Sequence, residues 1–416
     1  MTNGRTSVFW ILCIMGTFAI LSSTMSKNPV LKPFSTYLGT PPEWTGIVAS
    51  ASTIPGIIVS LPAASLSDIL GRRKFLLVAG FVFASAPFLY LFITAWWQLI
   101  FVRFYHGFAT AIFVPVAEAS IAELFPDKRG ERISLFSSAT YVGRVAAPIL
   151  GGALLLVTNS GFYALYLAVG VAGIAALITG LLFWAGGDAP VSTEKKSKSE
   201  IIKKVFQGWR VIVGNHSVLI ASLIQACQYY AFGVVEFYLS GYLKESIELS
   251  WILTGIVTGS LTAIPIVAKP YMGRVSDRIG RRIPIVVGCI VSALPLLVIP
   301  HVTNFWVLLS LALIYGFGFA TVTAVTPALV SELVPKECVG ASMGFLDTMM
   351  DVGQTLGPII SGFILASSLQ YGGVFSSLAI VLLSSCIIFA LFQARTQSRN
   401  KHTLKNLRHT LEAKPN

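Results

Sequence analysis

The sequence predicts an all-α membrane protein with twelve transmembrane helices in two pseudo-symmetric six-helix bundles. Three features support this prediction: long apolar runs, basic residues in alternate loops, and an internal repeat. Of the 416 residues, 55% are hydrophobic and 12% are charged, against roughly 25% charged in an ordinary soluble domain. The mean hydropathy is +0.76. This composition excludes a water-soluble fold.

Apolar runs of about 20 residues recur along the whole chain, and a helix of that length crosses a hydrocarbon core of about 30 Å. A backbone inside lipid must satisfy its own hydrogen bonds, so each run is expected to be a helix. The first run lacks a convincing cleavage site, which favours a first span over a removable signal peptide. The predicted spans are 8–37, 46–66, 73–93, 97–122, 132–157, 162–184, 216–243, 251–272, 283–302, 305–330, 340–367 and 372–393.

Basic residues follow the even-numbered spans and are nearly absent from the other loops. Short loops rich in Lys and Arg stay in the cytoplasm, so both termini are predicted to be cytoplasmic, in a plasma membrane or a bacterial or archaeal inner membrane. The net charge of +12 is thus a topology signal and gives no support to nucleic-acid binding. The basic residues include Arg72, Arg73, Lys74, Lys128, Arg129, Arg132, Lys195, Lys196, Lys198, Lys203, Lys204, Arg210, Arg274, Arg278, Arg281 and Arg282.

An internal repeat relates the two halves of the chain. The two matched aspartates give its offset, because 277 − 68 = 209. Duplicated units of this kind place a binding site at the repeat interface in many secondary transporters. At this offset Gly71, Arg72, Arg73, Gly107 and Glu123 match Gly280, Arg281, Arg282, Gly316 and Glu332. After a one-residue insertion, Gly143, Pro148 and Gly152 match Gly353, Pro358 and Gly362 at an offset of 210.

The repeat, and a polar stretch between its copies, divide the chain into four segments. Residues 1–186 are predicted to form an N-terminal six-helix bundle, and residues 216–394 a C-terminal one. Residues 187–215 are predicted to be a cytoplasmic linker with an amphipathic segment, and residues 395–416 a basic cytoplasmic tail. For linker and tail, a solvated basic face that only supports the topology is the alternative.

The loop after span eight reads Gly273-Arg274-Val275-Ser276-Asp277-Arg278-Ile279-Gly280-Arg281-Arg282. It resembles the loop signature of the major facilitator superfamily, and this resemblance covers all twelve spans and implies the major facilitator fold. The copy after span two departs at Ala64 and Ile69, where the family usually has Gly and Arg.

The resemblance implies a charged latch at the cytoplasmic face, in which carboxylates at helix ends meet guanidinium groups. The alternative, basic topology plus a tight glycine turn, leaves the matched aspartates unexplained. The latch residues are Asp68, Gly71, Arg72, Arg73, Gly273, Asp277, Arg278, Gly280, Arg281 and Arg282.

Several titratable side chains fall inside the predicted spans. An unpaired charge at mid-bilayer costs about 3 kcal/mol or more, so each is expected to face a cavity or a partner. These functional candidates are Arg103, His106, Glu118, Arg144, Glu236, Asp347 and Asp351.

The segment from Leu99 to Gly107 is similar to the fourth-helix signature of proton-coupled family members, where an arginine, here Arg103, is commonly tied to proton movement. Its repeat equivalent is Ala312, because 103 + 209 = 312, so the architecture does not require this charge. A purely structural role for Arg103 stays open.

The segment from Gly143 to Gly152 resembles a signature of the family's drug/proton antiporters, except that Ala147 replaces the usual Gly before Pro148. Small residues also let helices approach closely, so tight packing between the halves is an equal alternative. The residues concerned are Gly143, Pro148, Gly151, Gly152, Gly357 and Pro358.

Asp347 and Asp351 are four residues apart, so they share one helix face and are expected to line a central pathway opposite Arg144. Two carboxylates on one face raise each other's proton affinity, which suits a site that loads and releases a proton. A structural ion pair with Arg144 is the alternative.

Span seven has a polar and aromatic face that is unlike a lipid-facing helix. Together with His106 it is predicted to line the substrate cavity, although aromatic residues also pack ordinary helix interfaces. Its residues are Gln225, Gln228, Tyr229 and Tyr230.

These features predict a secondary active transporter, with proton-coupled efflux of a small organic or amphiphilic compound by alternating access as the leading function. The coupling candidates are Arg103, Arg144, Glu236, Asp347 and Asp351. The alternative is proton-linked uptake of a small organic or inorganic anion, attracted by Arg103, Arg144 and Lys32. The expected partners are a small solute, protons and the lipid bilayer, and the chain is expected to function as a monomer.

An enzyme is not expected, because the five histidines are dispersed without a grouped nucleophile, base or metal set. The five cysteines occur singly, so neither a metal nor another cofactor is expected. A membrane receptor that transports nothing remains a third reading. These residues are His106, His216, His301, His402, His409, Cys13, Cys227, Cys289, Cys338 and Cys386.

Overall fold

The computed structural model describes residues 2–125, 128–159, 161–185, 214–335 and 339–412, and this part is helical without strands. The N-terminal half contains α1 (Thr2–Met25), α2 (Leu31–Tyr37), α3 (Pro42–Ser50), α4 (Ile54–Leu70), α5 (Arg72–Leu89), α6 (Trp96–Leu124), α7 (Arg129–Val157) and α8 (Phe162–Ala185). The C-terminal half contains α10 (His216–Gly241), α11 (Trp251–Ile279), α12 (Arg282–Val298), α13 (Phe305–Leu333), α14 (Val339–Ala366) and α15 (Gln370–Glu412). Short turns of helix are η1 (Tyr90–Phe92), η3 (Tyr242–Ser246) and η4 (Ile299–His301).

Within the described residues, eleven helices are long and apolar enough to cross a membrane. They match the predicted spans apart from the second, and the first ends earlier than predicted. The prediction carried that helix to residue 37, but α1 stops at Met25 and α2 begins at Leu31. Pro29 has no N–H to donate to the Met25 carbonyl, so the helix cannot continue unchanged through this point.

The predicted second span, 46–66, is two helices rather than one. α3 ends at Ser50 and α4 begins at Ile54, and the Thr53 hydroxyl donates to the Ser50 carbonyl at 2.9 Å in the turn between them. Pro55 cannot donate to the Ala51 carbonyl, which explains why the break falls here. Together α3 and α4 take the place of one span, so the twelve-span order is kept with a broken second member.

The outer surface of the bundles is apolar, as lipid contact requires. On α12 the exposed residues Ile283, Val287, Ile290 and Leu294 recur every three or four positions and form one stripe. Cys289 on the opposite face of this helix is buried against the neighbouring helices. Exposure of such stripes to water would be unfavourable, whereas in a bilayer they contact lipid chains that are equally apolar.

Each half packs as a bundle, and two helix pairs make the most extensive contacts between the halves. In the N-terminal half α1 packs on α7 and α8, α5 on α6 and α8, and α4 on α6. In the C-terminal half α10 packs on α14, α13 packs on α11 and α12, and α12 packs on α15. Between halves α7 packs on α11, and α3 packs on α14, which are the same crossing in repeat-related positions.

Glycines at these two crossings let the backbones touch. A Cβ on Gly46 of α3 would overlap the Pro358 carbonyl of α14, and a Cβ on Gly255 of α11 would overlap the Pro148 carbonyl of α7. The two glycines are repeat equivalents, because 46 + 209 = 255, and the prolines are equivalents at the offset of 210. Small residues at membrane helix crossings permit this close approach.

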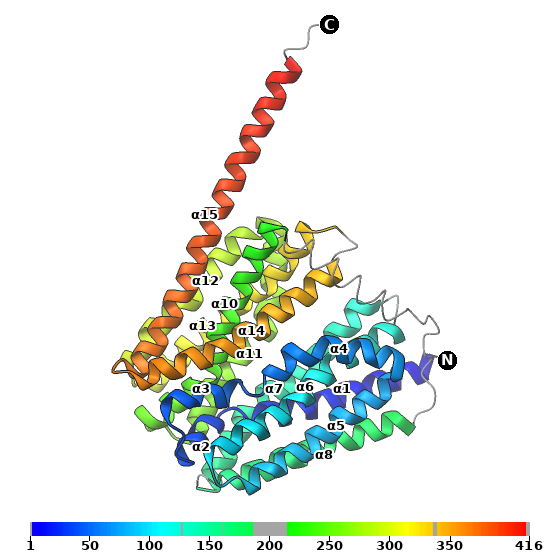
Figure 1. Ribbon diagram of the computed structural model, residues 1–416, viewed down its shortest axis with the longest axis vertical. Coiled ribbons are helices and arrows are strands. Elements are labelled where there is room, and N and C mark those ends of the chain that lie inside the picture. The colour runs from blue at the N-terminus through cyan, green and yellow to red at the C-terminus, as the bar shows by residue number, and fades with distance from the viewer. Residues whose placement is uncertain (1, 126–127, 160, 186–213, 336–338, 413–416) are drawn as a thin grey trace.

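We call the end of the molecule that carries Gly71 and Gly280 the basic side, and the other end the opposite side. Both glycines have a positive φ, +100° and +87°, which ends α4 and α11 in the same tight turn before a basic helix start. The ribbons of the two bundles meet near α2 and α3 on the opposite side and diverge toward the N-terminus on the basic side (Figure 1).

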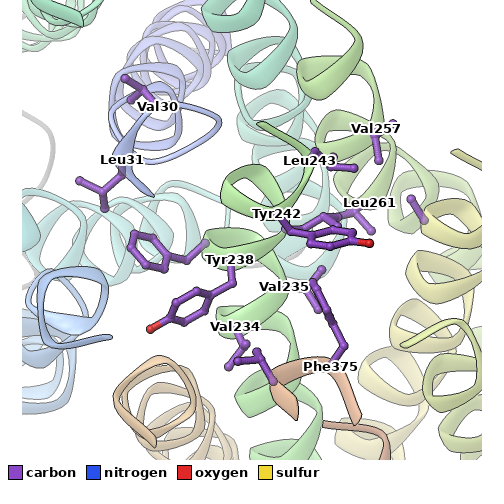
Figure 2. Close-up of a cluster of buried hydrophobic side chains, with 14 of the residues drawn as sticks. Val30, Leu31, Val234, Val235, Tyr238, Tyr242, Leu243, Val257, Leu261 and Phe375 are labelled. Carbon is purple, nitrogen blue, oxygen red and sulfur yellow. The ribbon is translucent and has the colours of Figure 1, made fainter. Parts of the chain in front are cut away.

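An apolar cluster on the opposite side spans both halves (Figure 2). It includes Val30 and Leu31 from the start of α2 together with Val234 and Tyr238 of α10. The Tyr238 hydroxyl donates to the Pro358 carbonyl at 3.1 Å, which ties this cluster to the α3–α14 crossing.

Residues 187–213 of the predicted linker lie outside the described residues.

The C-terminal helix α15 runs without a break from Gln370 to Glu412, so the predicted boundary at 394 between bundle and tail is not a helix end. This helix projects well beyond the bundle (Figure 1).

Candidate functional site

A cavity lies between the two halves. Both repeats supply its walls, which is where transporters built from internal repeats hold their substrates. The lining residues are Lys27, Leu31, Ala49, Thr53 and Arg103 from the N-terminal half and Gly233, Glu236, Phe237, Gln354 and Pro358 from the C-terminal half.

Arg103 on α6 is the most deeply buried charge of this cavity, with 1% of its surface exposed. Its Nη2 donates to the Ser52 hydroxyl at 2.5 Å and to the Ala49 carbonyl at 3.5 Å. Its Nε has no hydrogen-bond partner among the described residues. Gly107, one turn later, allows this approach, because a Cβ there would overlap the Ser52 carbonyl. The guanidinium is therefore held at the α3–α4 break by neutral groups.

Lys27 and Glu236 line the cavity from equivalent positions of the two repeats, since 27 + 209 = 236. Lys27 lies in the turn after α1 and Glu236 lies within α10. Their charges attract each other, yet among the described residues no ion pair within 4.0 Å joins them. Lys27 was missing from the predicted site, although the repeat maps Glu236 directly onto it.

Gln354 on α14 is the polar neighbour of Glu236. Its Nε2 donates to Glu236 Oε2 at 3.4 Å. Gln354 occupies the repeat position of Arg144, because 144 + 210 = 354, so one half has a neutral donor where the other has a cation. Gly233, one turn before Glu236, lets α10 and α14 approach closely enough for this contact.

The predicted acids of α14 lie on the basic side of the cavity. Asp351 packs against α4, where a Cβ on Gly56 would be 3.0 Å from its Oδ2. Asp347, one turn earlier, is exposed, and its charge interacts with that of Glu118 on α6. Three carboxylates from both halves thus lie along the path between the cavity and the basic side.

Arg144 does not form the ion pair that was the alternative interpretation of the two aspartates of α14. Its guanidinium carbon lies 5.5 Å from the centre of the Tyr141 ring, and in the described structure it has no ion pair with Asp347 or Asp351. The Tyr141 hydroxyl accepts a hydrogen bond from Lys269 of α11 at 3.4 Å, which links the halves near mid-helix. An aromatic face therefore replaces the expected carboxylate partner.

The predicted polar and aromatic residues of α10 are not among the residues that line this cavity. Gln228 is fully buried and donates from Nε2 to Ser292 of α12 at 3.2 Å, and Gln225 is buried as well. The Tyr229 ring packs on Phe319 of α13, with 5.2 Å between ring centres. Gln228 thus contacts its own bundle, whereas Gln225 and Tyr229 share the helix face of Glu236, because they precede it by eleven and seven residues.

Tyr230 and His106 also lie outside the cavity lining. Gly357 of α14 packs on the backbone of Tyr230, where a Cβ would overlap the Tyr230 carbonyl. His106 is buried, and its Nδ1 lies 3.5 Å from the Tyr90 hydroxyl inside the N-terminal bundle. None of the five predicted cavity residues is thus among the described lining residues of this cavity.

The motif after α11 forms a charged cluster within the C-terminal bundle. Arg281 donates to Asp277 at 2.6 Å, to Glu332 at 2.9 Å and to the Ser276 hydroxyl at 2.6 Å. Burial lowers the pKa of Arg281, but its hydrogen bonds to Glu332 and Asp277 raise it further, and the net direction is upward. Arg278 is exposed, and Gly273 has open space beside its Cα.

The motif after α4 repeats this cluster in the N-terminal bundle. Arg72 donates to Glu123 at 2.7 Å and to the Ser67 hydroxyl at 2.7 Å. Each of these residues is 209 positions before its counterpart, so the repeat is preserved in hydrogen bonds as well as in sequence. The side chain of Asp68 lies outside the described residues. The ion pairs of Arg72 with Glu123 and of Arg281 with Glu332 each connect helices of one bundle.

A second charged network joins the halves on the opposite side. Lys32 of α2 pairs with Glu245 of η3 at 3.1 Å, and the Thr36 and Tyr371 hydroxyls donate to the same carboxylate at 2.7 Å and 2.6 Å. Lys32 also donates to Thr36 at 2.8 Å. We call these four residues the outer network.

The antiporter-like motif supplies packing glycines. A Cβ on Gly143 would overlap the Thr17 carbonyl of α1, and a Cβ on Gly152 would overlap the Trp251 carbonyl across the interface. Gly151 packs on Pro29 in the turn after α1. This geometry supports the packing interpretation of the motif.

A family model described as the Major Facilitator Superfamily matches residues 12–267 and 221–413. The chain belongs to this superfamily. The two matches overlap and together cover both halves, in agreement with the repeat and with the resemblance of the motif loops.

Relatives within the superfamily differ in what their names state. The multi-drug resistance efflux pump PmrA of Streptococcus pneumoniae is 24% identical over 356 residues, which cover 85% of this chain and 86% of that protein. The "Probable galactarate/D-glucarate transporter GudP" of Bacillus subtilis is 25% identical over 421 residues, covering 89% of this chain and 88% of that protein. This member of the superfamily is therefore a transporter, and the names of its relatives differ in cargo and direction.

Among solved structures, a bacterial homolog of the human lysosomal transporter Spinster superposes with a TM-score of 0.77 at 14% identity, covering 94% of this chain and 96% of that one. This likeness supports the fold. In the described residues of this family member, no group of three or more His, Cys, Asp or Glu side chains could hold a metal ion.

Proposed function

We propose that this chain is a proton-coupled exporter of small organic compounds that works by alternating access. The observation that supports it most is the cavity between the repeats, lined by Arg103, Lys27 and Glu236. Buried charges in a membrane protein are costly and are kept where they serve a pathway. The efflux pumps among the relatives favour export over uptake.

We infer further that the basic side faces the cytoplasm, because short loops rich in Lys and Arg are retained there. With the basic side in the cytoplasm, the state described here is closed on the outer side and corresponds to an inward-open transporter. The contacts between halves involve the opposite-side portions of α3, α7, α11 and α14, at Gly46, Gly152, Gly255 and Pro358. The outer network closes the same side.

Protons are proposed to act at the carboxylates along the pathway. Glu236 faces the cavity, while Asp351 and Asp347 lie between it and the basic side. A carboxylate that loses its solvent or its counter-ion during a conformational change takes up a proton, and one that regains them releases it. Arg103 lies beside the cavity with neutral partners, so it can respond to charge changes there.

Uptake is the second candidate function, favoured by the relative named as a sugar-acid transporter. Export and uptake would use the same cavity, and both would require the basic side and the opposite side to open in turn. They differ in whether solute and proton cross together or exchange.

Flux in proteoliposomes with an imposed pH gradient tests the proposal. A panel of amphiphilic organic acids, amines and neutral amides is loaded, and movement of each is followed with the inside acidic and then with the inside alkaline. Export by antiport predicts that the solute moves against the proton flow. Movement with the proton flow would support uptake instead, and flux that ignores the gradient for every compound would contradict proton coupling.

A further inference from the structure

The central cavity contains more positive than negative charge. Lys27 and Arg103 line it as cations, and Glu236 is its only carboxylate within the described lining. Arg103 is bonded to the Ser52 hydroxyl and the Ala49 carbonyl, both neutral. Among the described residues, neither cation has a carboxylate within 4.0 Å. The protein thus places two cations at its central site without a direct counter-ion.

Two cations in the cavity without a close counter-ion lower the stability of the protein unless a ligand compensates their charge. The penalty for moving an ion out of water is recovered only by a close partner of opposite charge and by hydrogen bonds. The Arg103 side chain is almost completely buried and its Nε is without a partner in the described structure. An anion that enters the cavity would supply both the charge and the missing acceptor, and Arg is well suited to hold the two oxygens of a carboxylate.

Beside the charged residues and the polar Thr53 and Gln354, five residues of the cavity wall are apolar. Leu31, Phe237 and Pro358 line it together with Ala49 and Gly233. A cavity whose wall combines cationic and apolar residues suits an amphiphile, in which a single ionic group is attached to a hydrocarbon body.

We propose that the substrate of this cavity is an amphiphilic organic carboxylate, whose anionic group binds between Lys27 and Arg103 and whose apolar part packs on Leu31, Phe237 and Pro358. This rests on the proposed transport function, but it holds for export and for uptake alike. Glu236 competes with the substrate for Lys27, because its charge is attracted to the same ammonium group. Selectivity follows: an amine is repelled by two cations, and an amide brings no charge to offset them.

The test compares head groups on a constant body. The probes are 2-naphthoate, 2-naphthamide and 2-naphthylmethylamine, with octanoate, octanamide and octylamine as a second set. Dissociation constants are measured on the purified chain in lipid nanodiscs. We expect each carboxylate to bind about 30-fold or more tightly than its amide, the scale of a buried charge pair, and the amines to bind most weakly.

Variants assign the effect to the cavity. Lys27→Gln should weaken carboxylate binding by about 30-fold or more, and Lys27→Arg should restore most of it. Glu236→Gln should tighten carboxylate binding, because the competing anion is removed. The matched control is Lys128→Gln, which removes an exposed lysine that pairs with Glu131, three residues later on the surface. Melting temperatures show whether each variant is folded, and Lys27→Arg keeps the test decisive if Lys27→Gln is not.

Two results would overturn the substrate class: amines that bind more tightly than carboxylates, or unchanged carboxylate affinity in folded Lys27→Gln. Flux measurements separate this from the transport proposal. Flux of amines without flux of carboxylates contradicts the carboxylate class and leaves transport standing. Carboxylate binding that depends on Lys27, with no flux of any probe, contradicts transport and leaves the binding site standing.

Discussion

The two ends of the molecule use the same kind of bond for different purposes. On the basic side, Arg72 binds Glu123 at 2.7 Å and its repeat counterpart Arg281 binds Glu332 at 2.9 Å, and each bond connects helices of one bundle. On the opposite side, Lys32 binds Glu245 across the two bundles. A rocking motion of the bundles would carry the first two clusters along intact, whereas it must break the outer network.

This difference indicates which contacts set the conformational equilibrium. The outer network and the glycine crossings at Gly46 and Gly255 hold the opposite side closed in the present state. The basic-side clusters keep each bundle rigid, so that motion is concentrated at the interface. A change at the opposite side should therefore alter the balance of states, and a change in a basic-side cluster should mainly alter one bundle.

The largest expected effect is at the glycine crossing. Gly46→Val places a side chain where the Pro358 carbonyl lies, so the opposite side cannot close and transport should fall to background. Overpacking of this kind costs about 1–3 kcal/mol, and backbone cannot move aside as a side chain can. Gly372→Ala is the control, because its Cβ would meet nothing within 4 Å. Flux near the wild-type level in Gly46→Val would break the comparison between the two ends.

The next effect concerns Asp351, which lies between the two ends. Asp351→Asn should abolish gradient-driven flux yet allow downhill exchange, because an amide resembles the protonated acid but cannot release a proton. Arg144 stacks on Tyr141 and has no ion pair with Asp351 in the described structure, so adding Arg144→Gln should not rescue the loss. Flux and melting temperature are measured in both single variants and in the double variant. Recovery of both properties in the double variant would show that Asp351 serves only to neutralise Arg144.

Loss of the outer network should shift the states without abolishing transport. Glu245→Gln leaves Lys32, whose side chain is 5% exposed, without its charged partner. Unpairing a buried group costs about 1–3 kcal/mol, so the state open on the opposite side should become about 5- to 150-fold more populated. Labelling of Ala49→Cys, in a background without other cysteines, by an impermeant reagent added on that side measures this population. Glu248→Gln, an exposed carboxylate three residues later, should label like the parent.

The smallest effect is expected in the basic-side clusters. The side chain of Glu332 is 54% exposed and that of Glu123 is 38% exposed, and surface ion pairs contribute about 0–1 kcal/mol. Glu332→Gln and Glu123→Gln should therefore lower unfolding stability slightly and by similar amounts. Asp277→Asn, which removes another exposed partner of Arg281, should also lower stability slightly and leave membrane insertion intact, because topology depends mainly on basic residues. Clearly different losses of unfolding stability in the two glutamate variants would show that the repeat-related ion pairs are not equivalent in energy.

The fold could be predicted from the sequence because its signals are long and redundant. Apolar runs located the spans, and the matched motif loops located the repeat. The breaks after Met25 and Ser50 were missed because hydropathy continues through Pro29 and Pro55, and only the missing proline N–H interrupts the helix.

The site was predicted in part. Arg103 and Glu236 were found because a charge inside a membrane span is conspicuous. Lys27 was missed, although the repeat offset leads from Glu236 to it. Gln228 was assigned to the cavity, but it donates to Ser292 inside its own bundle. A helix with polar residues on more than one face does not reveal from sequence which face meets the partner bundle.

The central claim is that the basic side closes as the opposite side opens around one cavity. Spin-label distances measured at both ends test it most directly. One labelled variant carries Leu70→Cys and Ile279→Cys, repeat equivalents at the exposed basic ends of α4 and α11, and the other carries Tyr37→Cys and Ser246→Cys, repeat equivalents on the opposite side. On addition of 2-naphthoate and a change of pH, the account predicts that the first distance shortens in the same fraction of molecules in which the second lengthens. Distances that change together, or that stay fixed in a sample that transports, would contradict it.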